Sequence, residues 1–159
     1  IAGAVNVPTR EDFAAANIAG TQAVIDAATK AGVSRFVHVS SLAAREPGLS
    51  NYGWSKAGAE AAVRGSALDW TIVRPPAIYG PRDSDMLELF RMAQRGFVLL
   101  PPPGRASIIH VEDLARLLLA LAAVPGKNET IEPDDGAPLA HRDLALAIGR
   151  AVGRRVLTL

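Results

Sequence analysis

Short apolar runs alternate along this chain with longer segments in which apolar residues recur at helical spacing. A short apolar run without polar alternation is typical of a strand that is buried on both faces of a parallel sheet. The strands expected on this basis lie at residues 34–39, 69–74, 130–132 and 155–159, and residues 1–5 are expected to form the end of another strand as it passes into a loop. The helices expected between them lie at residues 9–30, 51–67, 86–95, 114–124 and 139–152. The alternation predicts an α/β fold built on a parallel sheet.

End signals support several of these boundaries. Thr9 is a good N-cap, Glu11 and Asp12 place acidic residues in the first helical turn, and Gly32 is expected to stop that helix. Pro75 and Pro76 end the strand before them, because proline cannot donate to a sheet ladder.

The composition is that of a soluble domain with one good core: 159 residues, 49% of them hydrophobic. No segment reaches the roughly 20 uninterrupted apolar residues of a membrane span, and residues 1–7 lack the pattern of a signal peptide. The formal net charge is +1 with both signs mixed along the chain, so nothing predicts nucleic acid as a partner. The absence of cysteine excludes disulfides and thiolate chemistry and is compatible with a cytoplasmic protein.

The most informative stretch is Ser40–Lys56, in which Lys56 stands four positions after Tyr52. On a helix each residue turns by about 100°, so these two side chains project from one face, about 40° apart. An ammonium group beside a phenol favours the phenolate and makes a tyrosine usable as a general acid or base. A solvated pair on a helix surface has the same spacing, so the context decides between the two interpretations.

That context resembles a known family. A hydroxyl at a strand end (Ser41), a short loop and Tyr-x-x-x-Lys opening a helix resemble the catalytic segment of the short-chain dehydrogenase/reductase superfamily, and most of all its extended and atypical members, the NAD-dependent epimerase/dehydratase-like proteins. Arg74-Pro75 at the next strand end and residues 107–115, which resemble the family's "ihVxDla" segment, extend the resemblance over nearly the whole chain.

The resemblance implies one partial NAD(P)-binding domain over residues 1–159. It would contain part of a doubly wound, Rossmann-like parallel sheet and a small C-terminal substrate-binding lobe, with the lobe's elements mainly within residues 81–159.

The resemblance also implies roles for individual residues. Tyr52 would be the general acid/base, Lys56 would activate it and hold the nicotinamide ribose, and Ser41 would orient the substrate oxygen. Asn17, in an Asn-x-x-Gly-Thr segment, would bond to main chain, help hold a water and complete a proton relay; the alternative is an exposed helix asparagine. The residues implied to bind the cofactor, NAD or NADP, are Ala2, Gly3, Tyr52, Lys56, Pro75 and Ile78.

One part of the family pattern is absent. No Gly-x-x-Gly-x-x-Gly loop precedes a helix, although the amides and helix dipole of such a loop normally hold the pyrophosphate. The chain begins at Ile1 rather than at methionine, which indicates a processed or incomplete product. We therefore expect the 159-residue chain alone to be inactive and to bind NADH and NADPH weakly, while a full-length parent is competent.

Other chemistry is less well supported. Leu42 and Ala43 stand where the 4,6-dehydratases carry an Asp-Glu pair, so dehydration has no evident acid/base pair. Asp83 and Asp85 are interpreted as turn and N-cap residues, and no metal is expected. The loop and helix that follow are expected to set substrate specificity.

Several polar residues are assigned structural roles. His38 is interpreted as a satisfied core histidine, and Glu60 with Arg64 as an i,i+4 pair on an exposed helix face. Trp54 is assigned to packing, and His110 and Asp113 are assigned to the start of a helix.

The leading hypothesis is an NAD(P)-dependent oxidoreductase or epimerase that acts on a secondary alcohol or its ketone, with a nucleotide sugar among the candidate substrates. Its partner would be a small-molecule substrate, and a homodimer is compatible with the pattern. The alternative is a non-catalytic NAD(P)-binding subunit or sensor of the atypical family, such as the complex I accessory-subunit type. A third interpretation is a piece of a larger protein with no independent role.

Overall fold

The computed structural model describes residues 3–159, which divide into two compact units. The first unit contains residues 3–76 together with Leu114–Pro133. The second contains Ala77–Asp113 and Asp134–Leu159. The chain therefore enters the second unit twice, and the assignment of that unit to a substrate-binding lobe stays a prediction.

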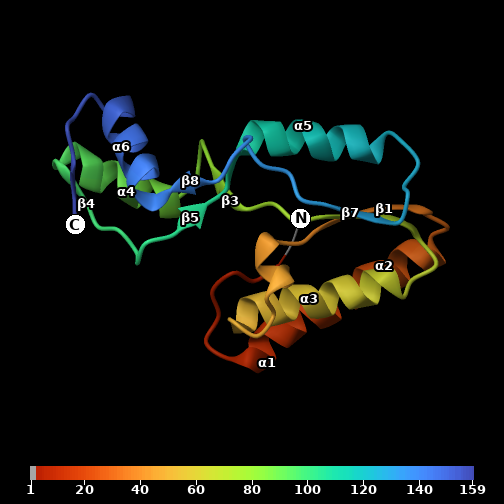
Figure 1. The fold of residues 1–159 in the computed structure, drawn as a ribbon. Helices are drawn as coiled ribbons and strands as arrows, with labels where there is room; N and C mark the ends of the chain where they lie inside the picture. The colour runs from red at the N-terminus through yellow and green to blue at the C-terminus, as the bar shows by residue number, and fades with distance from the viewer. Residues whose placement is uncertain (1–2) are drawn as a thin grey trace. The chain divides into compact units, whose positions relative to one another are not determined.

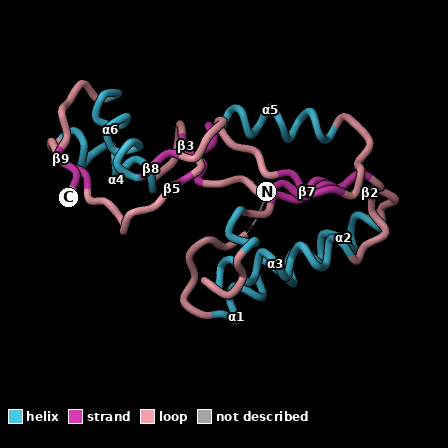
Figure 2. The backbone as a smooth tube through the Cα atoms, viewed as in Figure 1, coloured by secondary structure: helices cyan, strands magenta, loops and turns pink. Residues whose placement is uncertain are grey.

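A three-stranded parallel sheet lies at the centre of the first unit (Figures 1 and 2). Its order is β1-β2-β7, formed by β1 (Arg35–Val39), β2 (Asp69–Val73) and β7 (Glu129–Ile131). In Figure 1, α2 (Gly20–Lys30) and α3 (Asn51–Arg64) lie on one side of the sheet and α5 (Val111–Ala122) on the other. Helices on both sides of a parallel sheet confirm the predicted α/β, Rossmann-like fold class.

The core of this unit forms where α2 and α3 meet the central strand. Ile25, Val63, Leu68 and Ile72 make one buried cluster, in which Val63 and Ile72 are fully inaccessible to solvent. On the opposite side, Arg35 donates to the carbonyl of Leu121 in α5 through Nε and Nη2, at 3.0 and 2.7 Å. The sheet is thereby held to helices on both faces.

The helical segment predicted at residues 9–30 has the predicted ends and an irregular middle. Thr9 caps it by accepting a hydrogen bond from the Asp12 amide at 3.1 Å, and Gly32 ends it at φ 68°. Between α1 (Arg10–Phe13) and α2, however, residues Ala14–Ala19 form a π-helix. The apolar spacing did not predict this π-helix.

The strand end predicted at residues 1–5 is wrong for the residues described. Residues 3–9 contain no strand, and the Val5 side chain is 67% exposed. The backbone of Ala4 bonds to a side-chain amide of the neighbouring helix instead of to a sheet ladder. Ile1 and Ala2 lie outside the described residues.

Other boundaries shift slightly. A 3-10 helix, Leu42–Arg45, forms in the loop after β1. α3 ends at Arg64, before residue 67, and the Ser66 hydroxyl donates to the Val63 carbonyl at 2.7 Å at this end.

The second unit contains two helices and three strand pairs. The helices α4 (Asp85–Gln94) and α6 (His141–Ala151) pack around a core of Ala93, Val98, Ala145 and Ile148. The pairs are β3 (Ala77–Tyr79) with β6 (Ile108–His110) and β4 (Phe97–Val98) with β9 (Leu157–Thr158), both parallel, and β5 (Arg105–Ala106) with β8 (Leu139–Ala140), antiparallel. Among the described residues, no helix combines the length and the hydropathy needed to cross a membrane.

Candidate functional site

The candidate site lies in the first unit, at the carboxyl edge of its sheet. β1 and β2 end in register, with Val39 opposite Val73. Beyond this point the two chains stay joined, because the amide of Ser40 donates to the Val73 carbonyl at 2.7 Å and the amide of Leu42 donates to the Pro75 carbonyl at 2.9 Å. Ligands of open α/β sheets bind at this edge, so the backbone brings Ser41 and Pro75 to the expected place.

The helix that carries the tyrosine and the lysine starts at the same edge. The Ser50 side chain caps α3 by accepting a hydrogen bond from the Gly53 amide at 2.9 Å. A Cβ at Gly53 would lie 2.6 Å from the Ala43 carbonyl oxygen, so only glycine lets the first turn approach the loop after β1 this closely. Tyr52 and Lys56 are both within α3, so the shared helical face is confirmed.

Lys56 is buried, with only 8% of its surface exposed. Its Nζ donates to the Val39 carbonyl at 2.8 Å, which holds the ammonium at the end of β1. An ammonium has three donors, so two N–H groups are left for a ligand. Burial lowers the pKa of Lys56 from its usual 10.5, and the Glu60 carboxylate partly opposes that shift.

Asn17 lies in the π-helix and is buried, which excludes the interpretation of an exposed helix asparagine. Its amide clamps the backbone of Ala4: Oδ1 accepts from the Ala4 amide at 2.8 Å, and Nδ2 donates to the Ala4 carbonyl at 3.0 Å. Nδ2 also donates to Oγ of Ser55 at 2.9 Å, and that hydroxyl donates to the Tyr52 carbonyl at 2.8 Å. Main-chain bonding by Asn17 is thus observed, and its role in a proton relay stays a prediction.

A Cβ at Gly3 would lie 2.9 Å from Oδ1 of Asn17, so the chain before Ala4 runs tightly against this amide. Ser41 caps the 3-10 helix by accepting from the Ala43 amide at 3.2 Å. The ring of Tyr52 packs against Phe13, with ring centroids 6.3 Å apart. The cofactor-binding roles proposed for Ala2, Gly3, Pro75 and Ile78 stay predictions; Ala2 is outside the described residues, and Ile78 lies in β3 of the second unit.

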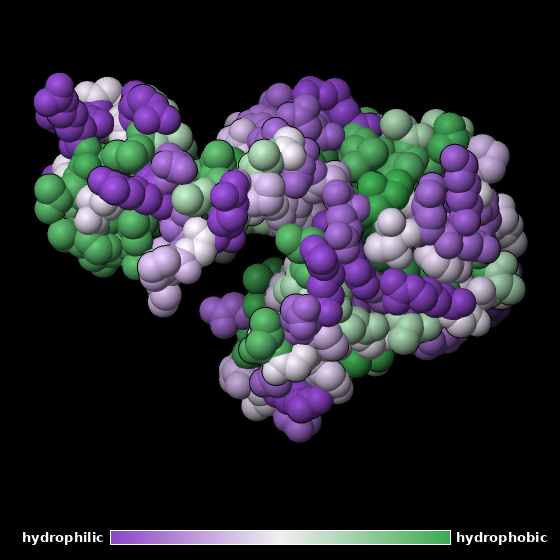
Figure 3. All heavy atoms as spheres, in the orientation of Figure 1, coloured by the Kyte–Doolittle hydropathy of each residue, from purple (hydrophilic) through white to green (hydrophobic). Residues whose placement is uncertain are grey.

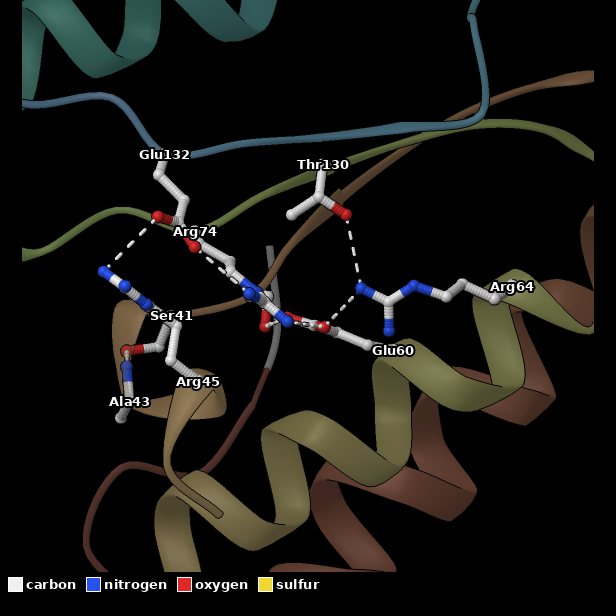
Figure 4. Close-up of polar contacts among 9 residues, drawn as sticks. Ser41, Ala43, Arg45, Glu60, Arg64, Arg74, Thr130 and Glu132 are labelled. Atoms are coloured by element: carbon white, nitrogen blue, oxygen red, sulfur yellow. Dashed lines mark hydrogen bonds and ion pairs between the residues drawn. The ribbon is translucent and has the colours of Figure 1, made fainter.

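The predicted i,i+4 pairing of Glu60 with Arg64 is confirmed, but its predicted place on an exposed helix face is wrong for Glu60. Glu60 is fully buried, and its carboxylate accepts four hydrogen bonds (Figure 4). Oε1 accepts from the Ser40 hydroxyl at 2.6 Å and from Nε of Arg74 at 2.8 Å. Oε2 accepts from Nη2 of Arg74 at 2.6 Å and from Nη2 of Arg64 at 2.8 Å.

These contacts connect the ends of all three strands. Arg74 follows β2, binds Glu60 with two nitrogens, and reaches Glu132 beyond β7 with a third at 3.1 Å. Ser40 follows β1. We call Ser40, Glu60, Arg64, Arg74 and Glu132 the Glu60 cluster. Because Ser41 and Pro75 are the next residues in the chain after two of its members, the cluster fixes their backbone positions.

The neighbours of Glu60 favour the ionised form of its carboxyl. Burial alone would raise the pKa of its carboxyl, but the hydrogen bonds from Arg74, Ser40 and Arg64 outweigh this and hold the pKa below its usual 4.5. In turn, the bond to Glu60 raises the pKa of Arg74 further above its usual value. A carboxylate has about four acceptor positions, and all of them are used here.

His38 is in the core as predicted, with 8% of its surface exposed, but it is not satisfied. Its Nε2 has no hydrogen-bond partner among the described residues. Burial above all, and then the positive charges of Lys56 and Arg64, lower its pKa from 6.5 to about 4, against an opposing effect of Glu60. His38 is therefore neutral at physiological pH.

Sequence reasoning missed Ser40, Ser55, Glu60 and Arg74 as parts of this site. A signal was present for Glu60, because it stands four residues after Lys56 and continues the same helical face. The smaller assignments agree with the structure: Asp83 accepts from the Met86 amide at 3.2 Å at the start of α4, and Trp54 packs under Arg10 with 3.9 Å between the guanidinium carbon and the ring centroid.

Comparisons with known proteins agree with this fold. A family model described as NAD(P)H-binding matches residues 3–125. The chain is 49% identical over 127 residues to the ceramide reductase of Caulobacter vibrioides, a match that covers 79% of this chain and 40% of that protein. It is 29% identical over 99 residues to subunit 9 of the NADH dehydrogenase [ubiquinone] 1 alpha subcomplex of Dictyostelium discoideum, covering 60% of this chain and 28% of that protein.

Among solved structures, MoeE5 in complex with UDP-glucose and NAD superposes with a TM-score of 0.82 at 20% identity. This match covers 99% of the chain and 62% of MoeE5, and at this identity it shows the fold alone. The chain thus spans 40% of the length of the ceramide reductase and 62% of that of MoeE5.

Proposed function

The chain belongs to the NAD(P)H-binding family, and from that premise we propose that the protein is an NAD(P)-dependent oxidoreductase that interconverts a secondary alcohol and its ketone. The observation that carries the proposal is the placement of Tyr52 and Lys56 on one face of α3, at the sheet edge where Ser41 and Pro75 also lie. NAD or NADP agrees with the family, and when bound it supplies or accepts the hydride.

The proton chemistry falls to this chain's own residues. Tyr52 donates a proton to the substrate oxygen during reduction and accepts one during oxidation. Lys56 provides a fixed positive charge on the same face of α3, because the Val39 carbonyl holds the ammonium in place. Ser41 directs the substrate oxygen toward Tyr52, and Asn17 supplies a relay through bound water.

The residues present fit a cofactor at this edge. Two N–H groups of Lys56 are left to bind hydroxyl groups such as those of a ribose. Gly3 has no side chain, so the backbone before Ala4 can run close to Asn17. We propose Gly3, Lys56 and Pro75 as cofactor contacts, with Ala2 and Ile78 as further members of the set.

For the substrate, two classes are supported to different degrees. The relative with 49% identity is named for reduction of ceramide, a lipid, and this supports a lipid ketone or alcohol. The UDP-glucose bound to MoeE5, a structure of 20% identity, supports epimerase chemistry on a nucleotide sugar more weakly. We therefore propose the lipid class first.

A non-catalytic subunit is the second candidate function, favoured by the similarity to the Dictyostelium NADH dehydrogenase subunit. The intact set of Ser41, Tyr52 and Lys56 favours catalysis over this alternative, because a subunit that only binds the cofactor needs no acid/base.

The test is hydride transfer by the complete gene product, followed through NAD(P)H absorbance with lipid ketones, simple ketones and nucleotide sugars. Tyr52→Phe should lower turnover by roughly 100-fold or more while nucleotide binding survives. Tyr79→Phe is the matched control, since it removes the hydroxyl of the chain's other tyrosine, in the second unit. Tight NAD(P)H binding without any Tyr52-dependent transfer would favour the non-catalytic subunit.

A further inference from the structure

The second unit contains a cavity of about 210 Å³ between its two helices and the connector that follows β4. α4 contributes Met86 and Leu89, α6 contributes Leu144 and Ile148, and the connector contributes Leu100 and Pro101. A dry apolar cavity of about 150 Å³ already holds a benzene ring, so this one has room for part of a hydrocarbon chain.

The wall of the cavity offers almost nothing to a polar ligand. The lining contains no carboxylate, no side-chain amide, no lysine and no arginine. His141 is the only polar residue among the lining residues. The Nδ1 atom of His141 lies 3.0 Å from the Pro102 carbonyl oxygen, so this nitrogen is engaged as a donor and only Nε2 is left for a ligand. Prolines at positions 101–103 have no N–H donors. A phosphate or a sugar would lose its hydration here without replacement.

The cavity is also held open by its surroundings. Val98, Ala145 and Ile148 belong to the buried core of this unit and cannot move into the space without unpacking it. The triple proline stiffens the connector. Leu99, which lines the cavity, is 57% exposed, so the apolar wall continues to the surface. Figure 3 shows hydrophobic residues gathered on the face formed by α4 and its neighbours.

We propose that this cavity binds a linear alkyl chain, and that the chain belongs to the lipid substrate. The second half of this inference rests on the proposed function, whereas the first half rests on the cavity alone. Methylene groups match the apolar side chains that make up the rest of the lining, and each one buried should strengthen binding about fourfold. The protein would then select its substrate by the hydrocarbon chain, and not by a nucleotide.

The test uses the complete gene product and the apolar fluorophore N-phenyl-1-naphthylamine as the probe, displaced by 1-alkanols of increasing length. Displacement should strengthen about fourfold per added methylene and then level off once the cavity is full.

Ala106→Leu fills the cavity from β5 and should weaken alkanol binding at least tenfold. Ala77→Leu fills it from β3 and is used if the first variant fails to fold. Ala120→Leu, the same change on the exposed side of α5, should have no effect.

Three results would overturn the proposal: no dependence on chain length, unchanged binding in both filled variants, or displacement of the probe by UDP-glucose alone. The two proposals fail separately. Length-dependent alkanol binding without Tyr52-dependent hydride transfer would leave the alkyl site standing and remove the proposed reaction. If the protein transfers hydride with a KM that changes neither with the substrate's chain length nor in the filled variants, the proposed reaction would stand. The assignment of the cavity to the substrate's alkyl chain would then be wrong.

Discussion

The two halves of α3 carry residue pairs with the same spacing and opposite character. Tyr52 and Lys56 stand four residues apart in the first half, as Glu60 and Arg64 do in the second. Lys56 makes one hydrogen bond to a carbonyl and keeps donors for a ligand, whereas the Glu60 carboxylate has every acceptor position filled. The difference comes from the strand ends that each half meets. One half is therefore suited to chemistry, and the other to holding that chemistry in place.

The largest effect should come from removing the carboxylate of the second half. Glu60→Ala leaves the mostly buried guanidinium of Arg74 without its main partner, so the free energy of unfolding should fall by about 3–5 kcal/mol. Urea unfolding measures this. The control is Glu88→Ala, which breaks the exposed pair with Arg91 and should cost less than about 1 kcal/mol. Equal losses in the two variants would mean that the Glu60 cluster is no more than a surface contact.

A substitution in the first half of α3 should lower turnover and leave stability nearly unchanged. Lys56→Met removes a buried ammonium whose charge is disfavoured by burial, at the expense of one hydrogen bond to Val39. Stability should stay within about 1 kcal/mol of the wild type, while turnover falls by roughly 100-fold or more and NAD(P)H binding weakens. Calorimetry measures the stability and the NAD(P)H binding of the variant, and steady-state kinetics measures its turnover. A large loss of stability with normal turnover would reverse the roles assigned to the two halves.

The buried side chain of His38, whose pKa is affected by Lys56, Glu60 and Arg64, predicts that the stability of the protein depends on pH. The folded protein holds the pKa of His38 at about 4, below its usual 6.5, so between these values the unfolded state binds more protons. The stability that this contributes is complete above pH 6.5 and is lost as pH falls toward 4. From pH 7.5 to pH 5 the free energy of unfolding should drop by about 2 kcal/mol from this group.

His38→Phe should flatten that slope, because the orphaned Nε2 and its protonation disappear together. Unfolding in urea at a series of pH values measures the slope in both proteins. A slope that persists in the variant would assign it to His110, His141 or the carboxylates instead.

The smallest effect should come from Arg64, whose side chain is 40% exposed. Arg64→Ala removes one of four hydrogen bonds to Glu60 and leaves the two-nitrogen contact of Arg74 intact, so the expected loss is about 0.5–1 kcal/mol. The loss should shrink at high salt, unlike that of Glu60→Ala. A loss as large as that of Glu60→Ala would show that Arg64, and not Arg74, neutralises the carboxylate.

The sequence was informative where a single element carries the signal. The Tyr52–Lys56 spacing, the Ser41 strand end and the cap at Thr9 depend on neighbours in the chain, so local patterns predict them. The parallel pairing of β1 with β2 followed from two apolar runs on either side of one helix.

The sequence was misleading where a residue's environment comes from elsewhere in the chain. Glu60 looks like half of a helix-surface pair until Arg74, fourteen residues on, is brought to it across the sheet edge. For Asn17 the sequence left an exposed position open as the alternative, because its partners, Ala4 and Ser55, belong to two other segments. The cavity of the second unit had no local signature either, because its wall is assembled from five separate stretches.

The π-helix at Ala14–Ala19 has a consequence for comparing this chain with others. A π-turn accommodates one residue more than the α-turn it replaces, so it amounts to a single-residue insertion within a helix. Within the π-helix Asn17 faces the Ala4 backbone, and in α2 Ile25 is buried. In a homologue whose helix is α throughout, a correct alignment needs a one-residue gap here. An ungapped alignment would pair Asn17 with the wrong neighbour and hide a shared asparagine.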